Sequence, residues 1–164
     1  LARVLRRRSE ADVNAHAILV GGMNGIPHHR AGCCMPIPGE EIRGYITQGR
    51  GITLHTAQCA QGRRMIAREG REVDVAWHDN AHLSEWEVVL EIVARDRPNL
   101  LRDLTAALAS SGVGVLRANI ATVGDSVRDR FRIRVRNVDQ AQLCMANLRG
   151  VAGVVSVSRT VQAS

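Results

Sequence analysis

The sequence contains no lysine, so all 22 of its basic residues are arginine. It is also poor in aromatic residues, with two Trp, one Tyr and one Phe among 164 residues. A surface that stacks successive bases of single-stranded nucleic acid on aromatic rings is therefore not expected. No apolar run approaches the roughly 18 residues that cross a bilayer, and the start of the chain lacks the basic-then-apolar order of a secretory signal. We therefore expect a cytoplasmic protein with no membrane partner.

Recognisable catalytic motifs are also missing. There is no Walker loop, no nucleophile elbow, no HExxH sequence and no pair of carboxylates at a recognisable catalytic spacing. The net charge of +6 is evenly divided, because each half of the chain, split at residue 82, has 11 arginines and 8 acidic residues. Neither half is a polybasic tail, and charge alone does not establish contact with RNA. These features point away from an enzyme.

The first half of the chain predicts a small α+β module at residues 16–77. It is preceded by residues 1–15, where the apolar spacing indicates the end of a linker helix whose beginning is missing, as in a fragment of a longer polypeptide. Glycine-rich residues 21–25 favour a hairpin. The other elements expected here are strands at Ala17–Val20, Ile42–Thr47, Ile52–His55 and Val73–Trp77, a loop at 49–51 and a short helix around Met65 and Ile66.

Cysteine and histidine form a candidate metal site within this module. Cys33-Cys34, followed after 20 residues by His55-x3-Cys59, offers three thiolates and one imidazole, enough for a closed tetrahedral zinc site. Adjacent cysteines diverge on a regular strand, so joint use of both requires an irregular backbone. His55 and Cys59 are four residues apart, so one helical turn after the strand could direct both at one ion. The spacing leaves open two buried thiols and an unrelated surface histidine.

The second half predicts the order βαββαβ of a ferredoxin-like fold over residues 85–161, after a polar, irregular linker at 78–84 and before a tail at 162–164. The strands are expected at Trp86–Ala94, Val113–Val123, Val127–Val135 and Val154–Val157. One helix has an apolar face of Leu100, Leu101, Leu104 and Leu108; the other is capped by Asp139 and has an apolar face of Ala141, Cys144, Met145 and Leu148. Cys144 is therefore expected in the core.

An arginine stripe follows the third of these strands. Arg128, Arg130, Arg132, Arg134 and Arg136 alternate with apolar residues and so share one face. Such a stripe suggests an RNA surface. In a ferredoxin-like sheet, however, this strand lies beside the first one, which presents Glu85, Glu87 and Glu91. We therefore favour cross-strand ion pairs over a dedicated RNA surface.

The stretch from Ala31 through Gly39 and on to Cys59 resembles the conserved-cysteine or zinc-finger module of RelA/SpoT homologues. The second half, with Asp96-Arg97 before a Leu-rich helix and then Ala118-Asn119-Ile120, is similar to the ACT domain of the same family. The resemblance implies an α+β fold in which a small zinc-binding module precedes an ACT domain. It also implies structural Zn²⁺ held by the ligands Cys33, Cys34, His55 and Cys59.

The resemblance further implies a regulatory role in the stringent response. Family members synthesise, and often hydrolyse, (p)ppGpp in preceding domains, so the parent would be a GTP/GDP diphosphokinase with or without hydrolase activity, and this fragment would not be an enzyme. The region would contact ribosomal RNA, bind a branched-chain amino acid or form a homodimer through its ACT domain. Two departures from the family pattern are Thr56 and Gln58, where an Arg and an Asp are common, and Asn99, where Gly is common.

If an amino acid binds, the main-chain amides near Asn99, Leu100 and Leu101 could receive its carboxylate at a helix start, and Asn119 could contact its amino group. The alternative is that Asn99 only caps the helix and Asn119 only ends a strand. A different class of function is an ACT-type amino-acid sensor attached to another biosynthetic enzyme. A redox switch at Cys33 and Cys34 is the third alternative.

Overall fold

The computed structural model describes residues 16–47, 51–69 and 71–160, so the predicted linker helix, most of the predicted 49–51 loop and the tail lie outside the described residues. The chain divides into two compact units. The first comprises residues up to 84 except 37–39, and the second comprises 37–39 and everything from 85 onward. Within the described part of the chain, no helix is long and apolar enough to cross a membrane.

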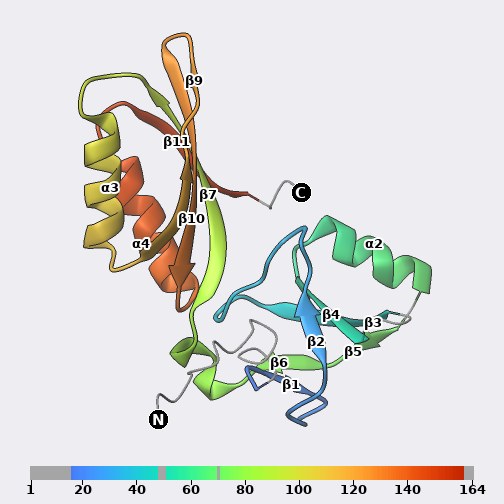
Figure 1. Ribbon diagram of the computed structural model, residues 1–164. Helices are drawn as coiled ribbons and strands as arrows, with labels where there is room; N and C mark the ends of the chain where they lie inside the picture. The colour runs from blue at the N-terminus through green and yellow to red at the C-terminus, as the bar shows by residue number, and fades with distance from the viewer. Residues whose placement is uncertain (1–15, 48–50, 70, 161–164) are drawn as a thin grey trace, which may run out of the picture. The chain divides into compact units, whose positions relative to one another are not determined.

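The described residues of the first unit form two small sheets, the α-helix α2 and a short 3-10 helix (Figure 1). Its four-stranded sheet has the order β2-β4-β3-β5, in which β2 pairs in parallel with β4 and the other pairs are antiparallel. A second sheet pairs β1 with β6, and helix α2 contacts β3. The bounds are β1 Ile18–Val20, β2 His28–Arg30, β3 Ile42–Thr47, β4 Gly51–Thr56, α2 Ala60–Glu69, β5 Glu72–Val73 and β6 Val75–Trp77.

Two predictions for this unit were wrong in detail. Instead of the hairpin expected at residues 21–25, the chain forms a tight turn. Val20 and Met23 exchange both main-chain hydrogen bonds, but no strand follows Met23 to continue the pairing. The partner of β1 is instead β6. The strand expected at Val73–Trp77 is divided at Asp74, and its two parts belong to different sheets.

A buried cluster of Ile18, Val20, Ile42, Ile52 and Leu54 forms the apolar core of the first unit.

The segment predicted as an irregular linker contains a short 3-10 helix, η1, at Asp79–Leu83. The His78 ring accepts a hydrogen bond from the main-chain N–H of Asn80 and so caps its start. Ala81 is buried. The polar composition of this segment therefore did not indicate the short 3-10 helix that it forms.

The second unit is a ferredoxin-like sheet in the order β11-β7-β10-β8, with the short strand β9 paired to β10. Helices α3 and α4 lie together against one face of this sheet, as Figure 1 shows. The bounds are β7 Trp86–Arg95, α3 Leu100–Ser110, β8 Gly114–Asn119, β9 Thr122–Val123, β10 Ser126–Val135, α4 Val138–Arg149 and β11 Val154–Thr160. The predicted α+β class and βαββαβ order are confirmed.

The core of the second unit follows from the alternation of buried and partly exposed residues along its strands. Every second residue of β7 from Trp86 to Ala94 is buried, and Leu104, Leu108 and Leu148 are fully buried on the helices. Cys144 is also fully buried, which confirms its predicted place in the core.

Three details of the second unit differ from prediction. Leu101 is 48% exposed, because it lies beside rather than on the buried stripe of α3. The N-cap of α4 is Asn137, whose side chain accepts from the main-chain N–H of Gln140, and Asp139 lies in the first turn. The strand expected at Val113–Val123 is interrupted after Asn119.

Four of the five arginines of the stripe form ion pairs across the sheet. Arg130 pairs with Glu91 at 2.9 Å, Arg132 with Glu87 at 3.7 Å and Arg134 with Glu85 at 3.6 Å, while Arg128 is 3.8 Å from Glu91. The prediction of cross-strand ion pairs is confirmed. Because these side chains remain partly exposed, each pair contributes about 0 to 1 kcal/mol to stability.

Candidate functional site

The two adjacent cysteines lie in a turn that follows β2. The carbonyl of Ala31 accepts hydrogen bonds from the main-chain N–H groups of Cys34 and Met35, at 3.4 and 2.9 Å. Met35 has a positive φ of 45°, which is uncommon outside glycine. This curved backbone brings both thiols toward one side, as joint use of the two cysteines requires.

His55 and Cys59 approach from a strand end and a helix start. His55 lies in β4 and is 3% exposed. Cys59 precedes α2: its N–H donates to the carbonyl of Thr56, and its own carbonyl accepts from the N–H of Arg63. A turn after the strand therefore brings the two residues together, as their spacing indicated. Gly62 permits this approach, because a Cβ there would lie 2.9 Å from the Cβ of His55.

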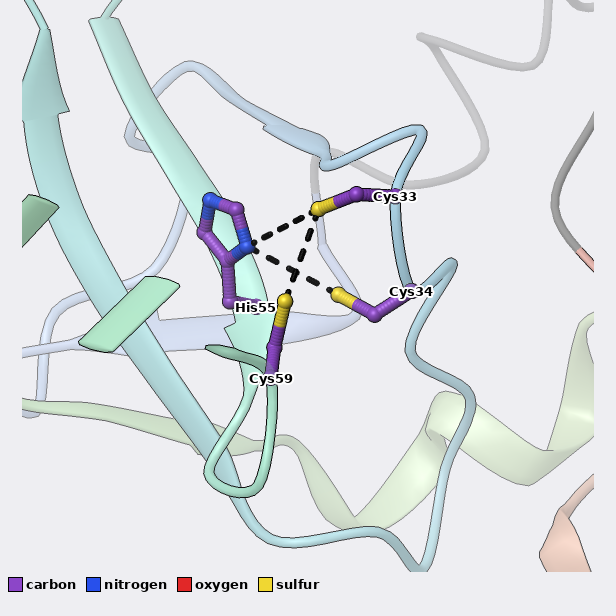
Figure 2. Close-up of side chains that lie close together, drawn as sticks. All are labelled: Cys33, Cys34, His55 and Cys59. Atoms are coloured by element: carbon purple, nitrogen blue, oxygen red, sulfur yellow. Dashed lines mark hydrogen bonds between the residues drawn. The ribbon is translucent and has the colours of Figure 1, made fainter. Parts of the chain in front are cut away.

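Four ligand atoms converge at this place (Figure 2). Sγ of Cys33 is 3.3 Å from Nδ1 of His55 and 3.5 Å from Sγ of Cys59, and Sγ of Cys34 is 3.7 Å from Nδ1 of His55. All four atoms lie within 4.8 Å of one another. Tetrahedral zinc with bonds of about 2.0 to 2.3 Å separates its ligand atoms by roughly 3.5 to 3.8 Å. The cluster therefore fits a metal ion of this size.

The electrostatics of the three thiols also suit a cation. Burial and the neighbouring thiols raise the pKa of Cys33 to about 12, and burial raises the pKa of Cys34. Burial opposes ionisation of Cys59 too, but its pKa is lowered overall, mainly by hydrogen bonding from the N–H of Gly62 and from the other two thiols. Three thiolates at these distances repel one another unless a cation lies between them.

The imidazole of His55 is prepared to act as a neutral ligand. Burial, and then the charge of His29, lower the pKa of His55, so that the uncharged ring predominates at neutral pH. Its Nδ1 points at the thiols. Its Nε2 is buried and has no hydrogen-bond partner among the described residues, and the ring packs edge-on to Tyr45 at 5.4 Å. Packing therefore orients this ring without a hydrogen bond at Nε2.

A small pocket lies in the second unit where β7 passes into α3. Its volume is about 220 Å³, and it is lined by Asp96, Arg97, Asn99, Leu100, Leu101, Arg102, Ile120, Thr122, Val127 and Asp129. Asn99 has a left-handed conformation with φ 63°, and its side chain makes no capping hydrogen bond. The first turn of a helix leaves main-chain N–H groups without intrahelical acceptors. Here Leu100, Leu101 and Arg102 line the pocket, and the N–H of Leu100 donates to the carbonyl of Arg97 at 3.3 Å.

The structure groups only part of the predicted amino-acid site. Asn99, Leu100 and Leu101 line the pocket, whereas Asn119 lies exposed at the end of β8 and is not in the lining. Sequence reasoning missed Asp129, which is 2% exposed and lies at an inward position of β10. The alternation of that strand carried the necessary signal, because Asp129 has the parity of Val127 and Phe131.

Comparison with known proteins agrees with both halves of this description. The RelA/SpoT RIS domain matches residues 18–78, and the ACT domain matches residues 82–159. The chain belongs to the RelA/SpoT family. It is a regulatory region of the kind found at the C-terminal end of these proteins, with a RIS domain followed by an ACT domain.

The curated relatives are much longer than this chain. The GTP pyrophosphokinase of Haemophilus influenzae is 34% identical over 93% of the chain, and the bifunctional (p)ppGpp synthase/hydrolase RelA of Mycobacterium tuberculosis is 32% identical over 97%. The chain spans about a fifth of the length of each. The crystal structure of the ACT domain from GTP pyrophosphokinase of Chlorobium tepidum has a TM-score of 0.44 and 21% identity, over 46% of this chain and 99% of that one.

Proposed function

We propose that this RelA/SpoT region regulates a (p)ppGpp synthetase with or without hydrolase activity and does not catalyse a reaction itself. The observation that carries the proposal is the pairing of a Cys3His cluster in the RIS domain with a ligand-sized pocket in the ACT domain. The RIS match and the named relatives favour this parent over a different biosynthetic enzyme with an ACT sensor.

The metal that suits the first site is Zn²⁺, bound by Cys33, Cys34, His55 and Cys59. Three sulfur ligands and one imidazole are a donor set typical of structural zinc, and all four positions are protein ligands, which leaves none for substrate. The ion would neutralise the thiolates and fix the turn after β2 to the start of α2. Its role here is therefore to fold a surface.

That surface includes three arginines that are candidates for contact with ribosomal RNA. Arg63, Arg64 and Arg68 lie exposed on α2 directly after Cys59. In the ranges that the structure describes, none of the three forms an ion pair, in contrast to the arginines of β10. Free guanidinium groups can bind phosphates in a bidentate manner. Thr56 and Gln58, which depart from the family pattern, take no part in this proposal.

The ACT domain would sense a branched-chain amino acid at its pocket. A pocket of about 220 Å³ is smaller than those that enclose drug-sized ligands and suits a small metabolite. The proposed carboxylate contact is to main-chain amides of Leu100 and Leu101. Exposed apolar residues on and after the edge strand β8, including Val115, Leu116 and Ile120, support pairing with a second copy through this edge.

The test of amino-acid sensing is calorimetric titration of the chain with valine, isoleucine and leucine. We expect saturable binding that weakens in Asn99→Ala, because alanine disfavours the left-handed turn that presents the helix start. Asn99→Gly is the matched control, since glycine keeps that conformation without the side chain, and it should retain binding. Absence of binding in the unmutated chain would leave the ACT domain as a docking or dimerisation element.

A further inference from the structure

One buried group in the ACT pocket is poorly satisfied. Asp129 is 2% exposed within an otherwise apolar layer, at a position that faces Ile92 of β7 in the strand register. The main-chain N–H of Ala121 hydrogen bonds to its carboxylate, but Oδ1 is buried without a partner among the described residues. A buried carboxylate with half of its acceptors unused lowers the stability of a fold.

The two arginines that line the same pocket are already engaged. Arg97 donates to the carbonyl of Ala152 and to Asp103, and Arg102 donates to Asp103. Burial raises the pKa of Asp129, and the negative charge of Asp96 raises it further against the opposing hydrogen bond from Ala121. The pocket thus holds a carboxylate that has no positively charged partner among the described residues.

The surroundings of Asp129 narrow the chemistry of that partner. A metal ion is disfavoured, because within the described ranges the one cluster of three or more metal-ligating side chains is the Cys3His cluster. Ile120 and Val127 provide apolar walls, and the start of α3 provides main-chain donors for an anion. A ligand that is complementary to the carboxylate, the apolar walls and the helix start has a positive group, an apolar part and an anionic group.

We propose that Asp129 binds the ammonium group of a small amphoteric ligand, an α-amino acid with an apolar side chain, whose carboxylate lies at the start of α3. This inference rests on the proposed amino-acid sensing and specifies which end of the ligand lies at Asp129 and which lies at α3. It assigns to Asp129 the role that was expected for Asn119. The ammonium group supplies the missing donor to Oδ1 and the compensating charge.

The experiment uses the full chain and three titrants that differ by one group. Valine carries both charges, 3-methylbutanoate lacks the amine, and 2-methylpropylamine lacks the carboxylate. Asp129→Asn should weaken valine binding by at least about tenfold, since hydrogen bonds to charged groups contribute that much. Removal of the amine should have a similar effect on the unmutated chain and little further effect on Asp129→Asn, because both changes delete one interaction.

Two controls separate recognition from folding. Asp129→Asn should unfold at the same or a higher temperature without ligand, because it removes a buried charge, so lost binding would not reflect lost structure. Asp139→Asn also removes one carboxylate of the ACT unit, but Asp139 is exposed in the first turn of α4 and does not line the pocket, so it should change valine affinity by less than about threefold.

Each outcome bears on one proposal or both. Equal valine binding by the unmutated chain and Asp129→Asn overturns the role of Asp129 and leaves amino-acid sensing intact. Binding of 2-methylpropylamine that requires Asp129, without any binding of valine, supports the ammonium site and overturns amino-acid sensing. If none of the three titrants binds the unmutated chain, both proposals are overturned.

Discussion

In the RIS unit a buried cluster of five aliphatic residues lies beside the Cys3His cluster, whereas the ACT unit encloses a layer of alternating strand residues and two helix faces. The first unit is built largely of two- to six-residue strands, and its site joins a turn, a strand end and a helix start. Ten-residue strands β7 and β10 form the centre of the second. The contrast agrees with our proposal that a bound metal ion stabilises the first unit, whereas apolar packing stabilises the second.

The two units also use arginine in different ways. In the ACT unit Arg130 and Arg132 pair with glutamates of the neighbouring strand. In the RIS unit Arg63 and Arg64 extend from α2 without an acidic partner in the described residues. A run of arginines in a sequence is therefore informative only once the opposite strand is known.

The largest expected effect comes from removal of the proposed metal ligand Cys34. Cys34→Ser should lose bound zinc and unfold the RIS unit, because the binding energy of structural zinc, about 10 to 16 kcal/mol in small zinc domains, is folding energy. Metal analysis and thermal unfolding would measure both effects. Cys144→Ser is the matched control: it alters a buried thiol of the ACT unit and should keep zinc. Unchanged zinc in Cys34→Ser would contradict the ligand assignment.

The converse change is Leu104→Ala in the ACT core. Leu104 is fully buried, so the cavity should destabilise that unit by about 2 to 5 kcal/mol while zinc content stays constant. Chemical unfolding followed by Trp86, the buried tryptophan of this unit, would report the loss. A fall in zinc content with Leu104→Ala would break the distinction between the two sources of stability.

A finer test within the RIS unit uses two glycines. A methyl group at residue 62 would press on the ring of His55, so Gly62→Ala should weaken metal affinity by about 10- to 100-fold, as displacement of a ligand's support does. Gly32→Ala meets open space and should leave affinity unchanged. Competition with a coloured chelator measures both. Equal affinity in the two variants would show that His55 does not need this close approach.

The smallest effects on stability separate the two arginine sets. Arg130→Glu with Arg132→Glu places like charges opposite Glu91 and Glu87 and should cost about 1 to 2 kcal/mol, with little change in RNA affinity. Arg63→Glu with Arg64→Glu should do the reverse: near-native stability and weaker, salt-dependent binding to ribosomes. If the β10 variant lost ribosome binding and the α2 variant lost stability, the arginine stripe of β10 would become the favoured RNA surface.

Long periodic patterns predicted the ACT unit well. The alternation in β7 indicated its buried face, and the glutamates on the polar face of that strand indicated the ion pairs of β10. The spacing of Leu104 and Leu108 indicated the buried stripe of α3. The cap of α4 was missed because Asn137 and Asp139 are both good capping residues, and only backbone geometry selects between them.

The RIS unit was less predictable because its strands are short and pair with distant partners. Nothing local to Ile18–Val20 shows that it pairs with Val75–Trp77 rather than with its own hairpin. The set of four candidate metal ligands came from spacing and family resemblance together, and the spacing also indicated the turn between His55 and Cys59, while the turn that brings the two adjacent thiols to one side required the fold. Asp129 was overlooked because its neighbours Arg128 and Arg130 drew attention to the opposite face.

The most direct test of a metal-built surface joined to an amino-acid sensor is hydrogen exchange of the full chain, measured alone, with a zinc chelator and with valine. We expect the chelator to remove protection from β2 to the start of α2, around the four metal-ligating residues. We expect valine to add protection at residues 96–102 and 120–129, around the ACT pocket. Protection that responds to neither reagent would contradict both assignments, and valine protection that falls elsewhere would contradict the assignment of the amino-acid pocket.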